Sequence, residues 1–183
     1  MNHLEGRLIR LRAIEPEDED ILYLWENDPQ SWQVSNTLAP FSRLVLRQYL
    51  AEARLDIFEA KQLRLVIEIR ETTKPIGLID LFDFDPFHQR AGVGILIGDQ
   101  DERGKGYAAD ALGTLIDYCF NYLILNQIYC SISESNAVSL HLFQKAGFRI
   151  TGKKEKWNRG FNGFTDEWFL QMLREDWLAR LPN

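Results

Sequence analysis

The chain has little of what stabilises disulfide-rich or metal-bound domains. Its 183 residues include two cysteines, Cys119 and Cys130, and three histidines, none of them at metal-ligand spacing. We therefore expect no disulfide framework and no metal site. Met1–Arg12 contains no hydrophobic signal stretch, and no run approaches the ~20 apolar residues of a spanning helix. These absences predict a soluble protein in a reducing, cytoplasmic location, without a membrane partner.

Basic residues are also fewer than acidic ones. The chain carries 21 Lys and Arg against 27 Asp and Glu, a net charge of −6. An acidic surface repels phosphate backbones, so no nucleic-acid partner is expected. The same acidity weakly favours cationic ligands, although it is also a common device for solubility. No repeat and no Pro/Gly/Ser-rich linker divides the sequence, which predicts a single domain over residues 1–183.

Apolar periodicity predicts the order of the elements. The predicted strands are 8–12, 63–69, 76–84, 91–97, 128–132, 151–157 and 167–173. The predicted helices are 16–25, 42–58, 104–122 and 137–146, with a last helical turn at 175–180. One helix crosses from an antiparallel group of strands to the next strand. The expected fold class is therefore α/β (α+β), with a mixed, largely antiparallel central sheet flanked by helices.

The most informative segment follows the strand that ends at Leu96-Ile97-Gly98. After a polar loop, Arg103-Gly104-Lys105-Gly106-Tyr107-Ala108 opens a long helix. The first turn of a helix has unpaired N–H groups and a positive dipole end, and glycines let the backbone approach a ligand closely. Together these features predict an anion cradle suited to a pyrophosphate.

Other nucleotide-binding loops fit this segment less well. A P-loop is excluded because Gly98 is one residue too far from Gly104, and Gly106 replaces the required hydroxyl residue. A Rossmann fingerprint matches Gly104-x-Gly106-x-x-Ala109, but residues 98–103 separate it from the strand, and the expected acid is missing. A dinucleotide-binding oxidoreductase stays a remote alternative, and a glycine-rich turn without a ligand stays open.

A second element lies about thirty residues later. Ser135-Asn136-Ala137-Val138-Ser139 leads into Leu142–Phe148, which resembles the "N-x-x-S…x-K-x-G-F" element of GNAT acetyltransferases. Residues 103–108 resemble the acetyl-CoA pyrophosphate loop of that family. The opening Leu11–Asp18 is similar to the branch of ribosomal-protein N-terminal and spermidine N-acetyltransferases. The resemblance covers nearly the whole chain and implies the GNAT acyl-CoA N-acyltransferase fold, with acetyl-CoA as the cofactor.

The resemblance also implies the residues that bind the cofactor. The backbone of the loop would hold the pyrophosphate through Arg103, Gly104, Lys105, Gly106, Tyr107 and Ala108. The strand end would pair with the pantetheine arm through Leu96, Ile97 and Gly98. The later element would contact the arm, the thioester and a phosphate through Asn136, Ser139, Phe143 and Lys145. Two alternatives remain, because Asn136 could simply cap its helix and Lys145 could be a solvated charge.

Two positions depart from the family pattern. Asp101 stands where Gln or Arg is frequent, and a carboxylate repels a phosphate. Phe143 stands where many members have a Tyr that protonates the departing thiolate. The substitutes to consider are Tyr107, Tyr129, Ser139 and His141. The missing proton donor keeps open a second hypothesis, a non-catalytic acyl-CoA-binding or sensing module.

The acceptor side is expected along Asp80-Leu81-Phe82-Asp83-Phe84-Asp85. A primary amine is protonated at neutral pH and must lose a proton before it attacks a thioester. Asp80 is the first candidate base and Asp83 the second, although they share a strand face only if a bulge intervenes. The alternative is that these acids have no catalytic role and simply lie on a solvated strand edge.

The predicted contacts of the cationic acceptor are Glu26, Asp28, Trp32 and Asp85. The predicted acceptors are a polyamine or diamine such as spermidine, or a protein N-terminal amine. The aromatic residues permit a homodimer or a higher homo-oligomer.

Overall fold

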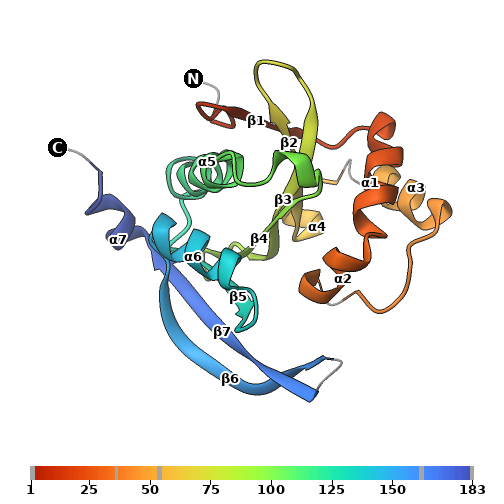
Figure 1. Cartoon of the computed structure of the whole chain (residues 1–183). Helices are drawn as coiled ribbons and strands as arrows, with labels where there is room; N and C mark the ends of the chain where they lie inside the picture. The colour runs from red at the N-terminus through yellow and green to blue at the C-terminus, as the bar shows by residue number, and fades with distance from the viewer. Residues whose placement is uncertain (1–2, 36, 53–54, 161–162, 182–183) are drawn as a thin grey trace.

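A seven-stranded sheet runs through the computed structural model, which describes residues 3–35, 37–52, 55–160 and 163–181. The strand order is β1-β2-β3-β4-β5-β7-β6, and β4 and β5 are parallel whereas the other neighbouring pairs are antiparallel (Figure 1). The strands are β1 Ile9–Ala13, β2 Leu63–Ile69, β3 Pro75–Asp85, β4 Arg90–Ile97, β5 Gln127–Ser133, β6 Arg149–Gly160 and β7 Gly163–Leu173. The predicted mixed, largely antiparallel sheet is confirmed.

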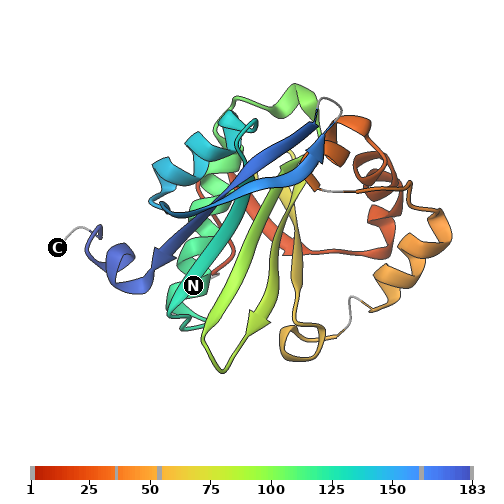
Figure 2. The same cartoon turned by 90° about the horizontal axis from the view of Figure 1, so that it is seen from below.

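Helices cover both faces of the sheet (Figure 2). They are α1 Glu19–Glu26, α2 Pro29–Ser35, α3 Arg43–Glu52, α4 Ile57–Ala60, α5 Tyr107–Asn121, α6 Ala137–Ala146 and α7 Arg174–Leu178. The larger core lies under α5, and a smaller one packs α1 and α3 on the opposite face. Within the described ranges, no helix has the length and apolar character needed to cross a bilayer.

The central strands are buried on both faces, which explains their nearly continuous apolar sequences. Ile67 of β2 and Ile79 of β3 belong to the core under α5. Their sequence neighbours Val66 and Leu78 belong to the core under α1 and α3. Side chains alternate between faces along a strand, so both cores need apolar residues from the same segments.

Two helical predictions in the N-terminal half are wrong. The segment 42–58 does not form one helix, because α3 ends at Glu52 and Asp56 caps a new helix, accepting from the N–H groups of Phe58 and Glu59. Residues 53 and 54 lie outside the described residues. No helix was predicted between residues 25 and 42, where α2 lies, because a proline often follows the end of a helix. Proline also fits the first turn of a helix, and Pro29 begins α2.

The helix after the glycine loop begins at Tyr107 rather than at Gly104. Gly104 and Gly106 have φ values of +76° and +88°, in the left-handed region that a right-handed helix does not use. A short 3₁₀ turn, Gln100–Glu102, precedes them and was not predicted.

The feature that positions the site is a separation between β4 and β5. The two strands pair only at Arg90–Gln127, Ala91–Ile128 and Gly92–Tyr129 among the described residues. Beyond Gly92, β4 continues to pair with β3, and β5 continues to pair with β7. Each strand therefore presents an edge without a strand partner to the gap. Backbone groups at such an edge need other hydrogen-bond partners.

Candidate functional site

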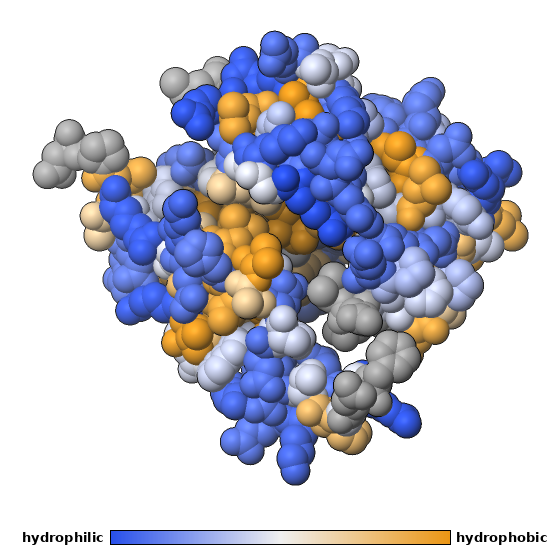
Figure 3. All heavy atoms as spheres, in the orientation of Figure 1, coloured by the Kyte–Doolittle hydropathy of each residue, from blue (hydrophilic) through white to orange (hydrophobic). Residues whose placement is uncertain are grey.

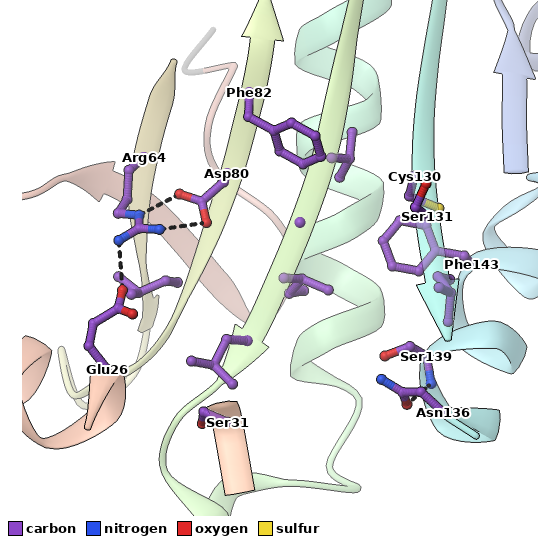
Figure 4. A pocket seen from close by; sticks show the side chains of 16 residues that line it. Glu26, Ser31, Arg64, Asp80, Phe82, Cys130, Ser131, Asn136, Ser139 and Phe143 are labelled. Carbon is purple, nitrogen blue, oxygen red and sulfur yellow. Dashed lines mark hydrogen bonds and ion pairs between the residues drawn. The ribbon is translucent and has the colours of Figure 1, made fainter. Parts of the chain in front are cut away.

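A cavity of about 320 Å³ occupies the place where β4 and β5 separate. Strands β2 and β3 and helix α1 contribute one side of it, and β5 and α6 contribute the other (Figure 4). Figure 3 shows a hollow in the middle of this face, with hydrophobic side chains along part of its wall. The cavity thus combines apolar walls with a small number of polar groups, as ligand sites commonly do.

One row of residues crosses the sheet at the level of the cavity. Arg64 of β2 lies opposite Asp80 of β3, and Asp80 lies opposite Gly94 of β4. The last β4–β5 pair joins Gly92 to Tyr129, so Gly94 and Ser131 stand at the same level on the two sides of the gap. Residues opposite one another face the same side of a sheet. Asp80 and Ser131 therefore lie on the same face of the sheet, on opposite sides of the gap (Figure 4).

The acidic side of the cavity contains a buried cation. Arg64 donates from Nε to Asp80 Oδ1 at 2.6 Å, from Nη2 to Asp80 Oδ2 at 3.3 Å, and from Nη1 to Glu26 Oε1 at 2.7 Å. Burial opposes the charge of Arg64, but the attraction of Asp80 and its other partners outweighs burial and raises the pKa of Arg64. Sequence reasoning missed Arg64. The three charges leave this wall with a net charge of −1.

Asp83 and Asp85 lie in a separate, open depression with Tyr129. The ladder between β3 and β4 has a bulge between Phe82 and Asp85, where Asp83 has φ +49°. Tyr129 donates its hydroxyl to Asp83 Oδ2 at 3.4 Å, and Asp85 accepts from the N–H of His88 at 2.9 Å. The required bulge exists, but Asp83 lines this depression and not the cavity that Asp80 lines.

The remaining predicted acceptor contacts form the corner between α1 and α2. Glu26 lines the cavity, whereas Asp28 Oδ1 accepts from the N–H of Gln30 at 3.0 Å at the start of α2. Trp32 donates from Nε1 to the carbonyl of Glu26 at 2.8 Å. Asp28 and Trp32 thus support the segment that carries Glu26.

The glycine loop presents the start of α5 to solvent. Gly106 is the N-cap, and no side chain caps the helix there, so N–H groups of the first turn, which Tyr107 and Ala108 begin, are open to a ligand. A Cβ built on Gly104 would meet no atom within 4 Å. The glycine there serves backbone conformation rather than packing. An exposed helix start of this kind fits an anion.

Lysines and acids alternate beside this loop. Lys105 donates to Glu102 at 2.8 Å, while Lys74 pairs with Glu102 at 2.9 Å and with Asp99 at 2.7 Å. Hydrogen bonds from Lys105, and then from Lys74, lower the pKa of Glu102. Lys74 comes from the β2–β3 turn, and sequence reasoning did not connect it to the loop. Asp101, which departs from the family pattern, is exposed in the 3₁₀ turn Gln100–Glu102.

The end of β4 offers an open edge directly before the loop. Leu96 and Ile97 pair with β3 on one side only. Arg103 donates from Nε to the carbonyl of Ile97 at 3.0 Å, so the loop folds back onto the strand end. At Gly98 a Cβ would lie 2.4 Å from the ring of Trp25, so close packing requires glycine there.

Helix α6 supplies the opposite wall. Asn136 Oδ1 accepts from the N–H of Ser139 at 3.1 Å and caps α6, while both residues also line the cavity. Capping and ligand contact are therefore compatible for Asn136. Phe143 is buried against Phe148 and lines the cavity. Lys145 is exposed in the last turn of α6 and does not line the cavity.

The site as a whole fits a long ligand with an anionic part. The α5 start suits phosphate groups, the open β4 edge suits an extended polar arm, and the cavity beyond it meets an acidic wall. Three regions follow one another along one gap. The first suits an anion, the second suits an extended polar chain, and the third attracts a cation. This arrangement can bring a bound acyl carrier and a cationic amine together.

Comparison with known proteins agrees with this geometry. A family model described as "Acetyltransferase (GNAT) domain" matches residues 8–149. The uncharacterized N-acetyltransferase p20 of Bacillus licheniformis is 27% identical over 178 residues, covering 97% of this chain and 99% of that protein. Spermidine N(1)-acetyltransferase of Escherichia coli (strain K12) is 26% identical over 145 residues, covering 79% and 75%.

Solved structures share the fold. A spermidine N-acetyltransferase from Vibrio cholerae, in complex with CoA and spermine, has a TM-score of 0.85 at 23% identity, covering 93% of this chain and 98% of that one. A dodecameric structure of spermidine N-acetyltransferase from the same organism has a TM-score of 0.79 at 24% identity, covering 96% and 99%. The resemblance indicated by residues 103–108 and 135–148 is confirmed.

Proposed function

The chain belongs to the GNAT acetyltransferase family, and we propose that it transfers the acetyl group of acetyl-CoA to a primary amine by direct attack in a ternary complex. The observation that carries the proposal is the single gap between β4 and β5, which joins an anion-binding helix start to an acidic wall. Both substrates would meet in this gap without a covalent enzyme intermediate. Positioning of the two reactants would supply much of the acceleration.

Acetyl-CoA is the acetyl donor of this family, and it supplies the activated thioester. The chain's own groups fit it. The backbone from Arg103 to Ala108 would hold the pyrophosphate at the start of α5. The open edge of β4 at Leu96–Gly98 would hydrogen-bond the pantetheine arm as a neighbouring strand does. Asn136, with Ser139 beside it, would hold the arm from α6.

The acceptor amine would bind at the wall formed by Glu26, Arg64 and Asp80. The net charge of this wall is −1, so it attracts one ammonium group to the gap. We assign Glu26 to holding the amine and Asp80 to accepting its proton, directly or through water. Arg64 shares the charge of Asp80 and fixes its orientation. Asp83 belongs to a different depression and takes no part in this assignment.

A polyamine or diamine is the first acceptor class we propose, and a protein N-terminus is the second. Relatives named spermidine acetyltransferases support the first class. We further propose that residues 1–183 form one acetyltransferase domain, because β6 and β7 extend the same sheet beyond residue 149. The dodecameric Vibrio cholerae enzyme supports the proposal of a homo-oligomer, which sedimentation velocity would test.

Thiol release from acetyl-CoA tests the proposed function. The purified chain is given acetyl-CoA with spermidine, spermine, short diamines and N-terminal peptides, one at a time. We expect thiol release with one class of amine, and mass spectrometry should find that amine heavier by one acetyl group. No turnover and no binding of acetyl-CoA would contradict the proposal.

The same assay separates the two candidate bases. Asp80→Asn removes a carboxylate from the cavity, and Asp83→Asn makes the same change three residues away in the other depression. We expect Asp80→Asn to lower kcat on the order of 10²-fold or more. A larger loss in Asp83→Asn would overturn the assignment of Asp80.

A second candidate function rests on Phe143. Phe143 lines the cavity and has no proton to give a leaving thiolate. A non-catalytic module that binds or senses acyl-CoA would bind acetyl-CoA tightly and release no thiol with any amine. Calorimetric titration beside the turnover assay distinguishes this outcome.

A further inference from the structure

The leaving sulfur needs a proton source, and the cavity has one that sequence reasoning did not consider. Ser131 of β5 lines the cavity, and its side chain is accessible. It stands level with Gly94 across the gap, on the face that also carries Asp80. The other thiol or hydroxyl candidates have different surroundings. Burial, for example, raises the pKa of the Cys130 thiol far above its ordinary range.

Ser131 is connected to a cation. Lys154 of β6 donates from Nζ to Ser131 Oγ at 3.1 Å. An ammonium group only donates hydrogen bonds, so the Ser131 oxygen accepts from Lys154. The hydroxyl hydrogen of Ser131 has Glu167 as one acceptor, since a hydrogen bond from Ser131 also lowers the pKa of Glu167, and it can rotate from Glu167 toward the cavity. Lys154 also lies 5.0 Å from the ring centroid of Trp157 and 5.8 Å from that of Phe169, which hold its ammonium beside β5.

A buried carboxylate, that of Glu167, pairs with Lys154. Lys154 donates to Glu167 Oε1 at 2.8 Å, and Asn158 donates to Glu167 Oε2 at 3.0 Å. Burial opposes ionisation of Glu167, but hydrogen bonds from Lys154 and Asn158 outweigh it and lower the pKa of Glu167. The side chain of Lys154 is 35% exposed, so it can exchange protons with water.

The sheet register places this network where the reaction would occur. An amine held at Asp80 must reach the acyl carbon on the face of the sheet that Asp80 shares with Ser131. The sulfur atom bonded to that carbon would then leave within the cavity that Gly94 and Ser131 both line. The hydroxyl of Ser131 is therefore on the leaving-group side, across the gap from the proposed base.

We propose that Ser131 is a catalytic residue that donates its hydroxyl proton to the departing sulfur, with Lys154 returning a proton to Ser131. This inference rests on the proposed acetyl transfer. A carbon–nitrogen bond forms to the acyl carbon, the carbon–sulfur bond breaks, and its electron pair stays on sulfur. Ser131 protonates that sulfur, Lys154 protonates the Ser131 oxygen, and water restores the proton on Lys154. The ammonium loses one proton to Asp80 before attack, the nitrogen loses a second after the bond to carbon forms, and both protons pass to solvent.

The first test compares two hydroxyls of the same strand. Ser131→Ala removes the proposed donor, while Ser133→Ala removes a hydroxyl on the same face that pairs with Ser135 at 2.9 Å and does not line the cavity. With the amine identified by thiol release, we expect Ser131→Ala to lower kcat on the order of 10²-fold. KM for both substrates should stay unchanged, and Ser131→Thr should restore activity.

A second readout needs no turnover. The thiol of coenzyme A bound to the protein is titrated by the ultraviolet absorbance of its thiolate. Hydrogen bonding to a charged form favours that form, so the wild-type chain should lower the pKa of the bound thiol relative to Ser131→Ala. Ser133→Ala should match the wild type.

The role of Lys154 is tested by the same two measurements, kcat and the pKa of the bound thiol. Lys154→Met removes the proposed proton source, and Lys153→Met removes the neighbouring lysine, which pairs with Asp166 instead. We expect Lys154→Met to lower kcat and raise the pKa of the bound thiol, as Ser131→Ala does, while Lys153→Met changes neither.

Two outcomes would overturn the relay. If the wild type transfers acetyl groups but Ser131→Ala matches Ser133→Ala in both readouts, the relay is wrong and the acetyltransferase proposal stands. If the wild type releases no thiol with any amine, the proposed function fails and the relay fails with it.

Discussion

At the scale of single residues, the charge balance of the cavity depends on Arg64. Its guanidinium makes hydrogen bonds to Asp80 and Glu26, and the three side chains are 22%, 18% and 14% exposed. Removing one partner of a buried pair leaves the other charges uncompensated. Arg64 therefore influences both folding and the attraction of a cationic substrate.

Arg64→Met should destabilise the fold and strengthen amine binding. The free energy of unfolding should fall by up to ~3 kcal/mol, the lower end of the range for breaking a buried ion pair. The net charge of the wall changes from −1 to −2, so KM for a diamine should fall. Urea unfolding and steady-state kinetics measure the two effects.

The control for Arg64→Met is Arg47→Met, which breaks the exposed pair of Arg47 with Glu19. It should change neither stability nor KM appreciably. A rise in KM for the amine in Arg64→Met would contradict the idea that the wall binds a cation.

Sequence reasoning predicted Asp80 on a strand but not its partner. Arg64 and Asp80 meet because β2 and β3 pair in one register, and a shift of one residue would separate them. Ser131 and Lys154 lie 23 residues apart, on β5 and β6, with β7 between those strands in the sheet. Such contacts depend on strand order and register, which local patterns do not specify.

At the scale of elements, glycines in one loop and helix have opposite roles. Gly104 has a left-handed conformation before α5, whereas Gly113 lies inside α5, and a Cβ at either position would meet no atom within 4 Å. Backbone conformation alone therefore decides the effect of adding a methyl group at each position.

Gly104→Ala should lower the free energy of unfolding by about 1–2 kcal/mol, the cost of a left-handed residue with a Cβ. Gly113→Ala should raise it by about 0.5–1 kcal/mol, because alanine is the better helix former. Coenzyme A affinity, measured by calorimetry, should fall in Gly104→Ala alone. An equal effect of both changes on stability would contradict this account.

Elements with a strong local signal were predicted well, and elements set by capping were not. The crossover helix α5 and the strands β2 and β3 have clear apolar patterns, and these elements are confirmed. At Pro29 and at Asp56 the question is whether the residue ends the preceding helix or begins the next one, and in the structure each begins a helix. Asp83 was placed with Asp80 only on condition of a bulge, whose direction no strand pattern specifies.

At the scale of the whole molecule, the free energy of unfolding should fall at both acidic and alkaline pH. Burial opposes ionisation of Asp18, but its hydrogen bonds with Arg12 and with the Glu15 backbone outweigh burial and lower the pKa of Asp18. The pKa of Glu167 is also lowered. Depressed carboxyl pKa values add stability above the unfolded value near 4, and that stability disappears as pH falls through the folded values.

Burial raises the pKa of Cys119 and Cys130, so the folded state holds thiol protons that the unfolded chain releases above about pH 8.5. The free energy of unfolding should therefore be nearly constant from about pH 5 to 8, and decline below about pH 4 and above about pH 9. Urea unfolding across pH measures this profile. A rise in stability below pH 4 would contradict the assigned carboxylates.

The gap between β4 and β5 also divides the sheet into two halves, β1–β4 and β5–β7, whose backbones pair at three residue pairs within the described part of the chain. A ligand that hydrogen-bonds along the open edge of β4 takes the place of a missing strand, so it acts as an eighth strand of the sheet. Its concentration then enters the folding equilibrium, adding about 2.7 kcal/mol when it reaches a hundred times its Kd. The fold would thus be most resistant to unfolding when the cellular coenzyme pool is full, and least resistant when that pool is depleted.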